Sequence, residues 1–206
     1  MPLGLQAVLV LLLICQNSLS LQFFASTVPG LEKTLLNEIK LLPDATQIEV
    51  QSSGVSFIGS ERSGLEALMW LRTPLKLMER LAEAKGLQSK DDLYDLCASV
   101  NWLHELPVHA TIKCDAVLGR DNPQSLTHTH FNSLTIKNAI VDQFRDRVGE
   151  RPSVDTENPD MSIVLYLHKA KATLYKVWSG DQSMHKRGYR ELMHKAVLRE
   201  TTAAAM

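Results

Sequence analysis

Residues 185–190 read HKRGYR, a combination of side chains suited to contact with a nucleic acid. The guanidinium groups of Arg187 and Arg190 present planar forks of N–H donors that match phosphate oxygens, and Lys186 adds a point charge. The ring of Tyr189 can stack on an exposed base. This short segment is the strongest chemical signal in the sequence, and it points to binding.

The charge around this segment supports the same interpretation. Residues 161–206 contain eight Lys and Arg against three Asp and Glu, a net +5, whereas the first 160 residues sum to −6. Such an asymmetry is typical of a segment that meets a polyanion. Two alternatives stay open at this point. The basic residues form a solvated face, or the two arginines pair with Asp181 and Glu191 and fix the segment to its own domain.

Other reactive residues carry weaker signals. His128 and His130 have a spacing used by metal ligands, but no C-x-x-C pair accompanies them, so we expect no metal site. A Ser-His-Asp triad could be drawn from Ser179, His185 and Asp181, but no G-x-S-x-G turn supports it. These residues therefore predict no catalysis.

Composition sets the limits for the fold. The 206 residues have room for one ordinary domain or two small ones. A hydrophobic fraction of 45% and a charged fraction of 22% exclude wholesale disorder. The formal charge of −1 gives no global sign of a nucleic-acid binder, and three cysteines cannot form a disulfide framework.

The N-terminus resembles a targeting segment. Residues 7–15, AVLVLLLIC, are too few for the roughly 20 apolar residues that span a bilayer, but they have the length of a signal-peptide hydrophobic region. Ser18 and Ser20 have the spacing of a cleavage site. We expect a signal-like leader over 1–20 that directs entry into an organelle such as a plastid, or into the endomembrane system. The alternatives are a buried strand or a mistaken gene start, which would leave the protein in the cytoplasm.

Strand and helix patterns alternate after the leader. We predict a strand over 21–27, a helix over 30–42 and a second helix over 65–71. Between the helices, residues 48–51 and 55–58 are β-rich runs separated by Ser-Ser-Gly, a hairpin signal. This β-α-β-β-α order is that of a small ferredoxin-like module, with its helices on one face of an antiparallel sheet.

A second unit follows. The periodicity of residues 75–85 fits a strand or a helix equally, and a short helix over 91–100 comes next. Residues 108–118 alternate as a strand, with Cys114 on the inward side as a small core residue. Residues 127–148 form the longest predicted helix. Its predicted apolar side consists of Phe131, Leu134, Ile136, Ile140, Val141 and Phe144.

A hairpin ends this unit. Residues 163–167 and 172–177 are β-rich runs that flank Lys169 and Lys171, and Lys176 lies on the second run. These three lysines would extend the positive surface of HKRGYR. The sequence therefore predicts an α/β (α+β) fold with two small sheets and no doubly wound parallel sheet.

Several motifs, taken in order, resemble one family. They are FAST and GLE at 24–32, GVSF-x-G at 54–59, KNAIVD at 137–142, RP-x-VD with PD at 151–160, and SGD with HKRGYR at 179–190. This set resembles the bacterial large-subunit ribosomal RNA guanine-N2-methyltransferases, and it covers residues 22–206. The resemblance implies a ferredoxin-like N-terminal domain followed by a THUMP domain, an RNA-binding module. Expected divisions are the leader 1–20, a ferredoxin-like region 21–62, a THUMP domain 63–178 and a basic linker 179–206.

The catalytic part of that family would follow. RETTAAA at 199–205 resembles the start of its S-adenosylmethionine-binding Rossmann domain, and the sequence stops at Met206. No G-x-G and no N-P-P-aromatic motif occurs. We therefore expect no Rossmann methyltransferase domain, no catalytic residue, and no bound cofactor or metal here, so that this chain alone is inactive.

The resemblance and the local charge together define the expected partner. We expect structured RNA, in particular large-subunit ribosomal RNA, and neither DNA nor a stable transmembrane span beyond the leader. The alternative is a non-enzymatic interaction module or gene fragment whose basic face is merely solvated. The candidate RNA-binding residues are Lys137, Lys169, Lys171, Lys176, His185, Lys186, Arg187, Tyr189 and Arg190.

Overall fold

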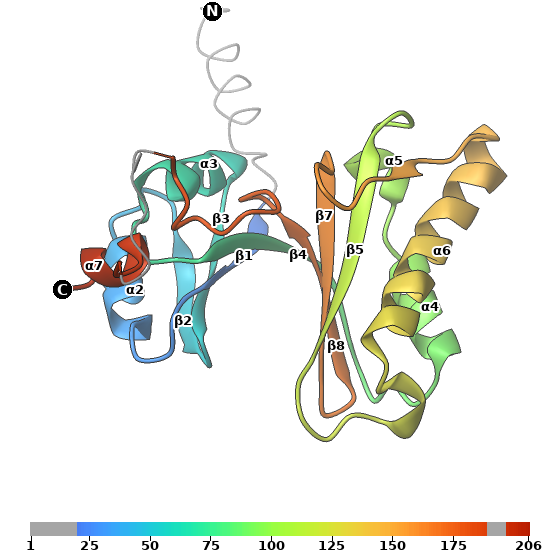
Figure 1. The fold of residues 1–206 in the computed structure, drawn as a ribbon, viewed down its shortest axis with the longest axis horizontal. Helices are drawn as coiled ribbons and strands as arrows, with labels where there is room; N and C mark the ends of the chain where they lie inside the picture. The colour runs from blue at the N-terminus through green and yellow to red at the C-terminus, as the bar shows by residue number, and fades with distance from the viewer. Residues whose placement is uncertain (1–19, 189–196) are drawn as a thin grey trace, which may run out of the picture.

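A computed structural model describes residues 20–188 and 197–206, which contain one mixed sheet with helices packed on one of its faces (Figure 1). The strands are β1 (Leu21–Ser26), β2 (Thr46–Gln51), β3 (Gly54–Gly59), β4 (Lys76–Lys85), β5 (Thr111–Leu118), β6 (Ser153–Val154), β7 (Met161–His168) and β8 (Lys171–Val177). The helices are α2 (Glu32–Ile39), α3 (Glu61–Trp70), α4 (Lys90–Ala98), α5 (Trp102–Glu105), α6 (Thr129–Val148) and α7 (Glu200–Ala204). A 3₁₀ turn covers Gln124–Leu126.

The prediction of two separate sheets is wrong. The strand order is β2-β3-β1-β4-β8-β7-β5-β6, a single sheet of eight strands. Strand β4 joins the two halves, because its first residues pair with β1 and residues from Met78 onward pair with β8. A register shift between Arg80 and Ala82 breaks the strict alternation of β4. That irregularity explains why periodicity did not identify residues 75–85 as a strand.

The other predicted strands and helices lie where the patterns placed them, and their ends follow local chemistry. Ser89 caps α4 by accepting a hydrogen bond from the backbone N–H of Asp92, whose carboxylate accepts one from the Ser89 N–H. Ser60 caps α3 through the N–H of Ser63. Helix α6 ends at Gly149, whose φ of 79° is a left-handed conformation that glycine adopts without strain.

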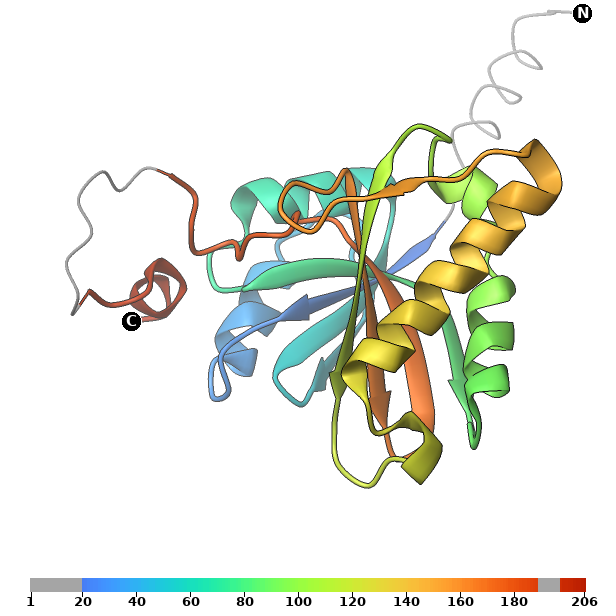
Figure 2. The ribbon, with the colours of Figure 1, turned by 45° about the vertical axis from the view of Figure 1, so that its right-hand side comes forward.

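Each half of the sheet has its own hydrophobic core on the helical face. Helices α2 and α3 cover the first core, which includes Phe23 and Phe57 of the sheet. Helices α4, α5 and α6 cover the second, around the fully buried Trp102. Figure 2 shows α6 lying along the second half with α4 beside it. Ala67 and Leu71 pack in the first core, so the expected boundary after residue 62 separates α3 from the strands it covers.

Helix α3 approaches the sheet closely through a glycine. A Cβ at Gly64 would lie 2.7 Å from both Cζ of Phe23 and Cζ3 of Trp178. Those two rings meet edge to face at 5.2 Å, which leaves them little freedom to move aside. The missing side chain at Gly64 therefore sets the distance between α3 and the sheet.

The predicted apolar side of α6 needs one correction. Phe131 is 50% exposed, whereas Asn132 is fully buried and donates a hydrogen bond to the carbonyl of Leu126. Phe131 lies in the first turn of α6, where its ring contacts His128 and the ammonium group of Lys90. Cys114 packs against the second core as predicted.

Candidate nucleic-acid interface

The lysines of the predicted basic surface lie on opposite faces of the sheet. Lys176 projects toward the helices, where its Nζ lies 2.8 Å from Oε2 of Glu105 on α5. Lys171 lines the helix-free face, and its Nζ lies 2.9 Å from Oε2 of Glu83. The structure therefore does not bring these lysines into one surface, and the RNA-binding role of each stays a prediction.

Residues 183–188 are fixed to the first half of the molecule. The N–H of Met184 donates to the carbonyl of Leu75 at 2.7 Å, and the Met184 side chain is buried. The guanidinium of Arg187 donates to the carbonyls of Met69 at 3.1 Å and Leu71 at 2.5 Å. Arg187 thus holds the end of α3. The segment is therefore fixed to its own domain, as the alternative expected, but Arg187 binds backbone carbonyls, and Asp181 pairs with Lys113 instead.

The other residues of HKRGYR differ from Arg187 in their surroundings. His185 places Nδ1 at 2.8 Å from the hydroxyl of Ser183. Lys186 is exposed and has no ion-pair partner among residues 20–188 and 197–206. Tyr189 and Arg190 lie outside the described residues.

Asp181 and Ser179 have structural partners. Asp181 accepts a hydrogen bond from Lys113 on β5 at 2.9 Å, and that bond raises the pKa of the Lys113 ammonium. The Ser179 hydroxyl accepts a hydrogen bond from the N–H of Leu77 at 3.3 Å. With His185 bound to Ser183, the residues of the hypothetical triad have separate partners.

Lys137 lines a cleft between α6 and β5. The cleft has a volume of about 470 Å³, and Lys113 and His130 also line it. Strand β6 pairs with only two residues of β5, so the rest of β5 is the edge of the sheet here. Burial raises the pKa of the Cys114 thiol in this cleft to about 12, which makes it a neutral and unreactive group. Within the described ranges, no group of three His, Cys, Asp or Glu could hold a metal ion.

A cluster of cations surrounds the turn between β7 and β8. We call Lys85, Arg120, Lys169 and Lys171 the hairpin cluster; all four residues are exposed. Lys85 pairs directly across the sheet with Lys171. The backbone N–H of Lys169 donates to the carbonyl of Arg120 at 3.3 Å, which ties the loop after β5 to this turn. Of the four, Lys171 alone has an ion-pair partner among the described residues.

The helix-free faces of the two half-sheets enclose a groove. The sheet bends at β4 and β8 (Figure 1), and the groove is lined by residues of β1 and the end of β2 on one side and of β5 and β7 on the other. The groove has a volume of about 590 Å³. Aromatic rings line it from three strands, namely Phe24, Tyr166 and Tyr175. Lys76 and Lys171 also line it, with Asp115 as the acidic group.

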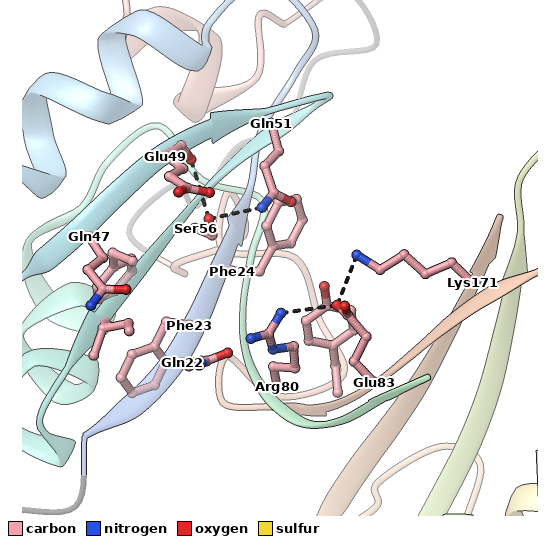
Figure 3. Close-up of a pocket in the computed structure, with 13 residues that line it drawn as sticks. Gln22, Phe23, Phe24, Gln47, Glu49, Gln51, Ser56, Arg80, Glu83 and Lys171 are labelled. Carbon is pink, nitrogen blue, oxygen red and sulfur yellow. Dashed lines mark hydrogen bonds and ion pairs between the residues drawn. The ribbon is translucent and has the colours of Figure 1, made fainter. Parts of the chain in front are cut away.

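A second hollow continues the groove along β1, β2 and β3 (Figure 3). It shares Phe24, Gln51, Lys171 and Tyr175 with the first, and Arg80 and Glu83 also line it. The Glu83 carboxylate accepts hydrogen bonds from Arg80 and from Lys171, as the dashed lines in Figure 3 show. Burial alone would raise the pKa of Glu83, but the hydrogen bond and charge of Lys171 and the charge of Arg80 outweigh it and lower that pKa. Glu83 is therefore ionised at neutral pH.

Sequence reasoning missed part of this surface. Lys85 and Arg120 are isolated cations in the sequence; strand pairing brings Lys85 to Lys171, and a loop hydrogen bond brings Arg120 to Lys169. The aromatic lining did leave a signal. Tyr166 and His168 alternate with buried residues on β7, which is the pattern of side chains on an uncovered sheet face.

Comparison with known proteins agrees with this architecture. A family model described as the RlmL ferredoxin-like domain matches residues 22–77, and a THUMP domain model matches residues 88–177. The chain contains an RlmL-type ferredoxin-like domain followed by a THUMP domain. The predicted ferredoxin-like and THUMP fold is thereby confirmed, and the two matches lie on either side of most of β4.

Curated relatives of this THUMP protein carry the name ribosomal RNA large subunit methyltransferase K/L. The chain is 34% identical to the protein from Syntrophotalea carbinolica and 36% identical to that from Colwellia psychrerythraea. In each case 90% of this chain aligns with 25% of the relative, so it spans about a quarter of their length. A solved chain from Listeria monocytogenes, described as a predicted N6-adenine-specific DNA methylase, superposes with a TM-score of 0.81 at 24% identity. The superposition covers 94% of this chain and 49% of the Listeria chain, and it shows that the two share a fold.

Several THUMP-protein motifs have structural roles. The carboxylate of Asp160 accepts hydrogen bonds from the N–H and hydroxyl of Thr111, and Asp155 accepts two from the loop that follows it. The Thr27 hydroxyl donates to the carbonyl of Thr73. These contacts hold strand ends and turns in place.

Proposed function

We propose that this THUMP protein binds structured RNA, with large-subunit ribosomal RNA as the expected class, on behalf of a methyltransferase activity supplied by other residues. The observation that carries the proposal is the THUMP match over residues 88–177, together with relatives named for methylation of large-subunit ribosomal RNA. The segment would select and hold the RNA while a catalytic domain modifies it.

The surface chemistry supports an RNA partner. Lys85, Arg120 and Lys169 have no ion-pair partner among the described residues, so their charges are available to phosphate groups. They lie near a groove lined by the exposed ring of Tyr166 and the half-buried rings of Phe24 and Tyr175, and unpaired bases stack on aromatic rings. Protein surfaces that combine free cations with aromatic rings are typical of RNA-binding modules.

A salt titration tests the proposal. Filter binding of large-subunit ribosomal RNA fragments at two salt concentrations should give an affinity that falls steeply with salt, because phosphate neutralisation releases counterions. Duplex DNA of equal length and heparin are the matched polyanions. Preference for RNA over both supports the proposal, and absence of binding at low salt refutes it.

An interaction module with a solvated basic face is the second candidate. It is favoured by one observation: Lys171, Lys176 and Arg187 all have partners within the protein. That candidate predicts equal affinity for RNA and heparin in the same titration. The outcome therefore separates the two functions.

We also propose that these residues alone bind no S-adenosylmethionine and transfer no methyl group. The sequence has no pair of glycines in G-x-G spacing to receive the cofactor at the end of a strand. Isothermal titration with S-adenosylmethionine should give no heat of binding, and a measurable heat would refute this proposal.

For localisation, we propose that the apolar leader directs the protein into an organelle or the endomembrane system. The leader lies outside the described residues apart from residue 20, and no helix within the described ranges is long and apolar enough to cross a bilayer. A fusion of residues 1–24 to a fluorescent protein should concentrate in a membrane-bounded compartment. Diffuse cytosolic fluorescence would refute the proposal.

A further inference from the structure

We propose that the groove on the helix-free face holds the base of an unpaired RNA nucleotide, and that the hairpin cluster binds the phosphates next to it. This inference rests on the RNA binding proposed above and names the RNA element that is recognised.

The turn of the β7–β8 hairpin carries charge at a conformational cost. Lys169 and Ala170 have φ of 50° and 58°, a left-handed pair closed by His168 and Lys171. Two-residue turns of this kind prefer Asn and Gly, because a Cβ is strained at positive φ. Lys169 therefore destabilises the turn while it places a positive charge at the tip of the β7–β8 hairpin.

Repulsion between neighbouring lysines destabilises this end of the sheet further. Lys85 lies directly opposite Lys171 across the strands, and like charges in directly opposed positions destabilise a sheet. Glu83 offsets the charge of Lys171 but is shared with Arg80. An excess positive charge therefore remains at the end of the sheet where Lys169 and Arg120 also lie, and a polyanion would relieve it.

The groove offers a stacking surface beside this charge. Tyr166 is 44% exposed and lies on an uncovered sheet face, and its ring centroid is 6.5 Å from that of His168. Across the groove, Phe24 contacts Tyr175 with ring centroids 6.0 Å apart. The volume of about 590 Å³ is in the range of pockets that hold small ligands. A base between these walls would stack on a ring on either side.

Polar groups suited to base edges surround the rings. Ser52 and Ser53 on the β2–β3 turn and Gln51 line the groove, and their side chains offer both donors and acceptors. Because Lys171 lines the groove and also belongs to the hairpin cluster, a phosphate on the cluster would place its base at the groove entrance. A paired base cannot enter, since its edges and faces are covered within the duplex. The geometry therefore selects single-stranded RNA.

The stacking part is tested with two RNA probes. One is a blunt RNA hairpin, and the other is the same hairpin with a short single-stranded extension. The wild type should prefer the extended RNA, and Tyr166→Ala should reduce that preference by on the order of tenfold, since stacking contributes about 1–3 kcal/mol per base. Tyr166→Phe retains the ring and should keep the preference. The proposal would be overturned if Tyr166→Ala preferred the extended RNA as strongly as the wild type and Tyr166→Phe do.

The charge part is tested at the turn. Lys169→Asn places a residue that tolerates positive φ in the turn and removes the charge, so the melting temperature should rise while RNA affinity at low salt falls several-fold. Ala170→Gly relieves the same kind of strain without a charge change, so it should raise the melting temperature and leave affinity unaltered. Unchanged affinity of Lys169→Asn would overturn the assignment of the cluster.

These outcomes differ from a failure of the proposed function. If the wild type binds neither RNA probe, RNA binding itself is refuted. If it binds both probes equally, RNA binding stands and the unpaired-nucleotide site is overturned. Displacement of RNA by heparin with equal affinity would identify the cluster as a general polyanion surface and would also overturn the site.

Discussion

Replacement of Arg187 by Ala separates a structural role from RNA contact. The guanidinium donates hydrogen bonds to the carbonyls of Met69 and Leu71, at the C-terminal end of α3. Hydrogen bonds to charged groups contribute about 1.5–3 kcal/mol when buried, and this group is exposed, so we expect the pair to contribute about 1–2 kcal/mol. Arg187→Ala should therefore shift the urea midpoint downward.

The RNA readout should stay unchanged in the same variant. The carbonyls at the end of α3 carry partial negative charge that disfavours a nearby phosphate, so Arg187→Ala should not alter the salt dependence of RNA binding. The matched control is Lys186→Ala at the exposed neighbour, which should leave the urea midpoint unaltered. The reasoning is refuted if Arg187→Ala keeps full stability and reduces the dependence on salt.

Three further substitutions test the packing and electrostatics of the fold. Trp102→Phe removes the indole N–H that donates to the buried carbonyl of Cys97 at 2.8 Å and should lower the free energy of unfolding by about 2 kcal/mol; an unchanged urea midpoint would contradict this. Gly64→Ala should lower it by about 1–3 kcal/mol through overpacking, and a stabilised variant would show that α3 can move away. Burial raises the pKa of Glu79 despite the hydrogen bond from Trp178, so wild-type stability should fall as pH rises through that raised pKa. Glu79→Gln lacks this ionisation and should gain stability relative to the wild type as pH rises from the ordinary pKa of a glutamate through the raised pKa of Glu79, whereas a pH-independent difference would contradict the assignment.

Local patterns predicted most of the elements because each depends on neighbours in sequence. The Ser-Ser-Gly turn identified the β2–β3 hairpin, and two β-rich runs on either side of Lys169 and Lys171 identified β7 and β8. Strand β4 was different. Its bulge between Arg80 and Ala82 disturbs the alternation, and its role as the strand that joins both half-sheets depends on partners distant in sequence.

The candidate site depends even more on contacts between residues that are distant in sequence. A lysine has the same appearance in a sequence whether it faces water or a carboxylate, and only the fold shows that Lys176 meets Glu105 on the helical face. The cations at Lys85 and Arg120 gave no sequence signal, because strand pairing and a loop contact bring them together. Charge counting therefore identified a stretch of sequence with excess positive charge but could not assign its members to one surface.

Lysine footprinting tests most directly whether RNA lies on the helix-free face. Acetylation of the free protein and of its complex with ribosomal RNA, followed by mass spectrometry, compares the accessibility of individual ammonium groups. We predict protection of Lys85 and Lys169 in the hairpin cluster, with no protection of Lys33 on α2 or Lys90 on α4, which are exposed on the helical side. Protection of Lys33 and Lys90 with unaltered Lys85 and Lys169 would contradict this interface and place the RNA on the helices.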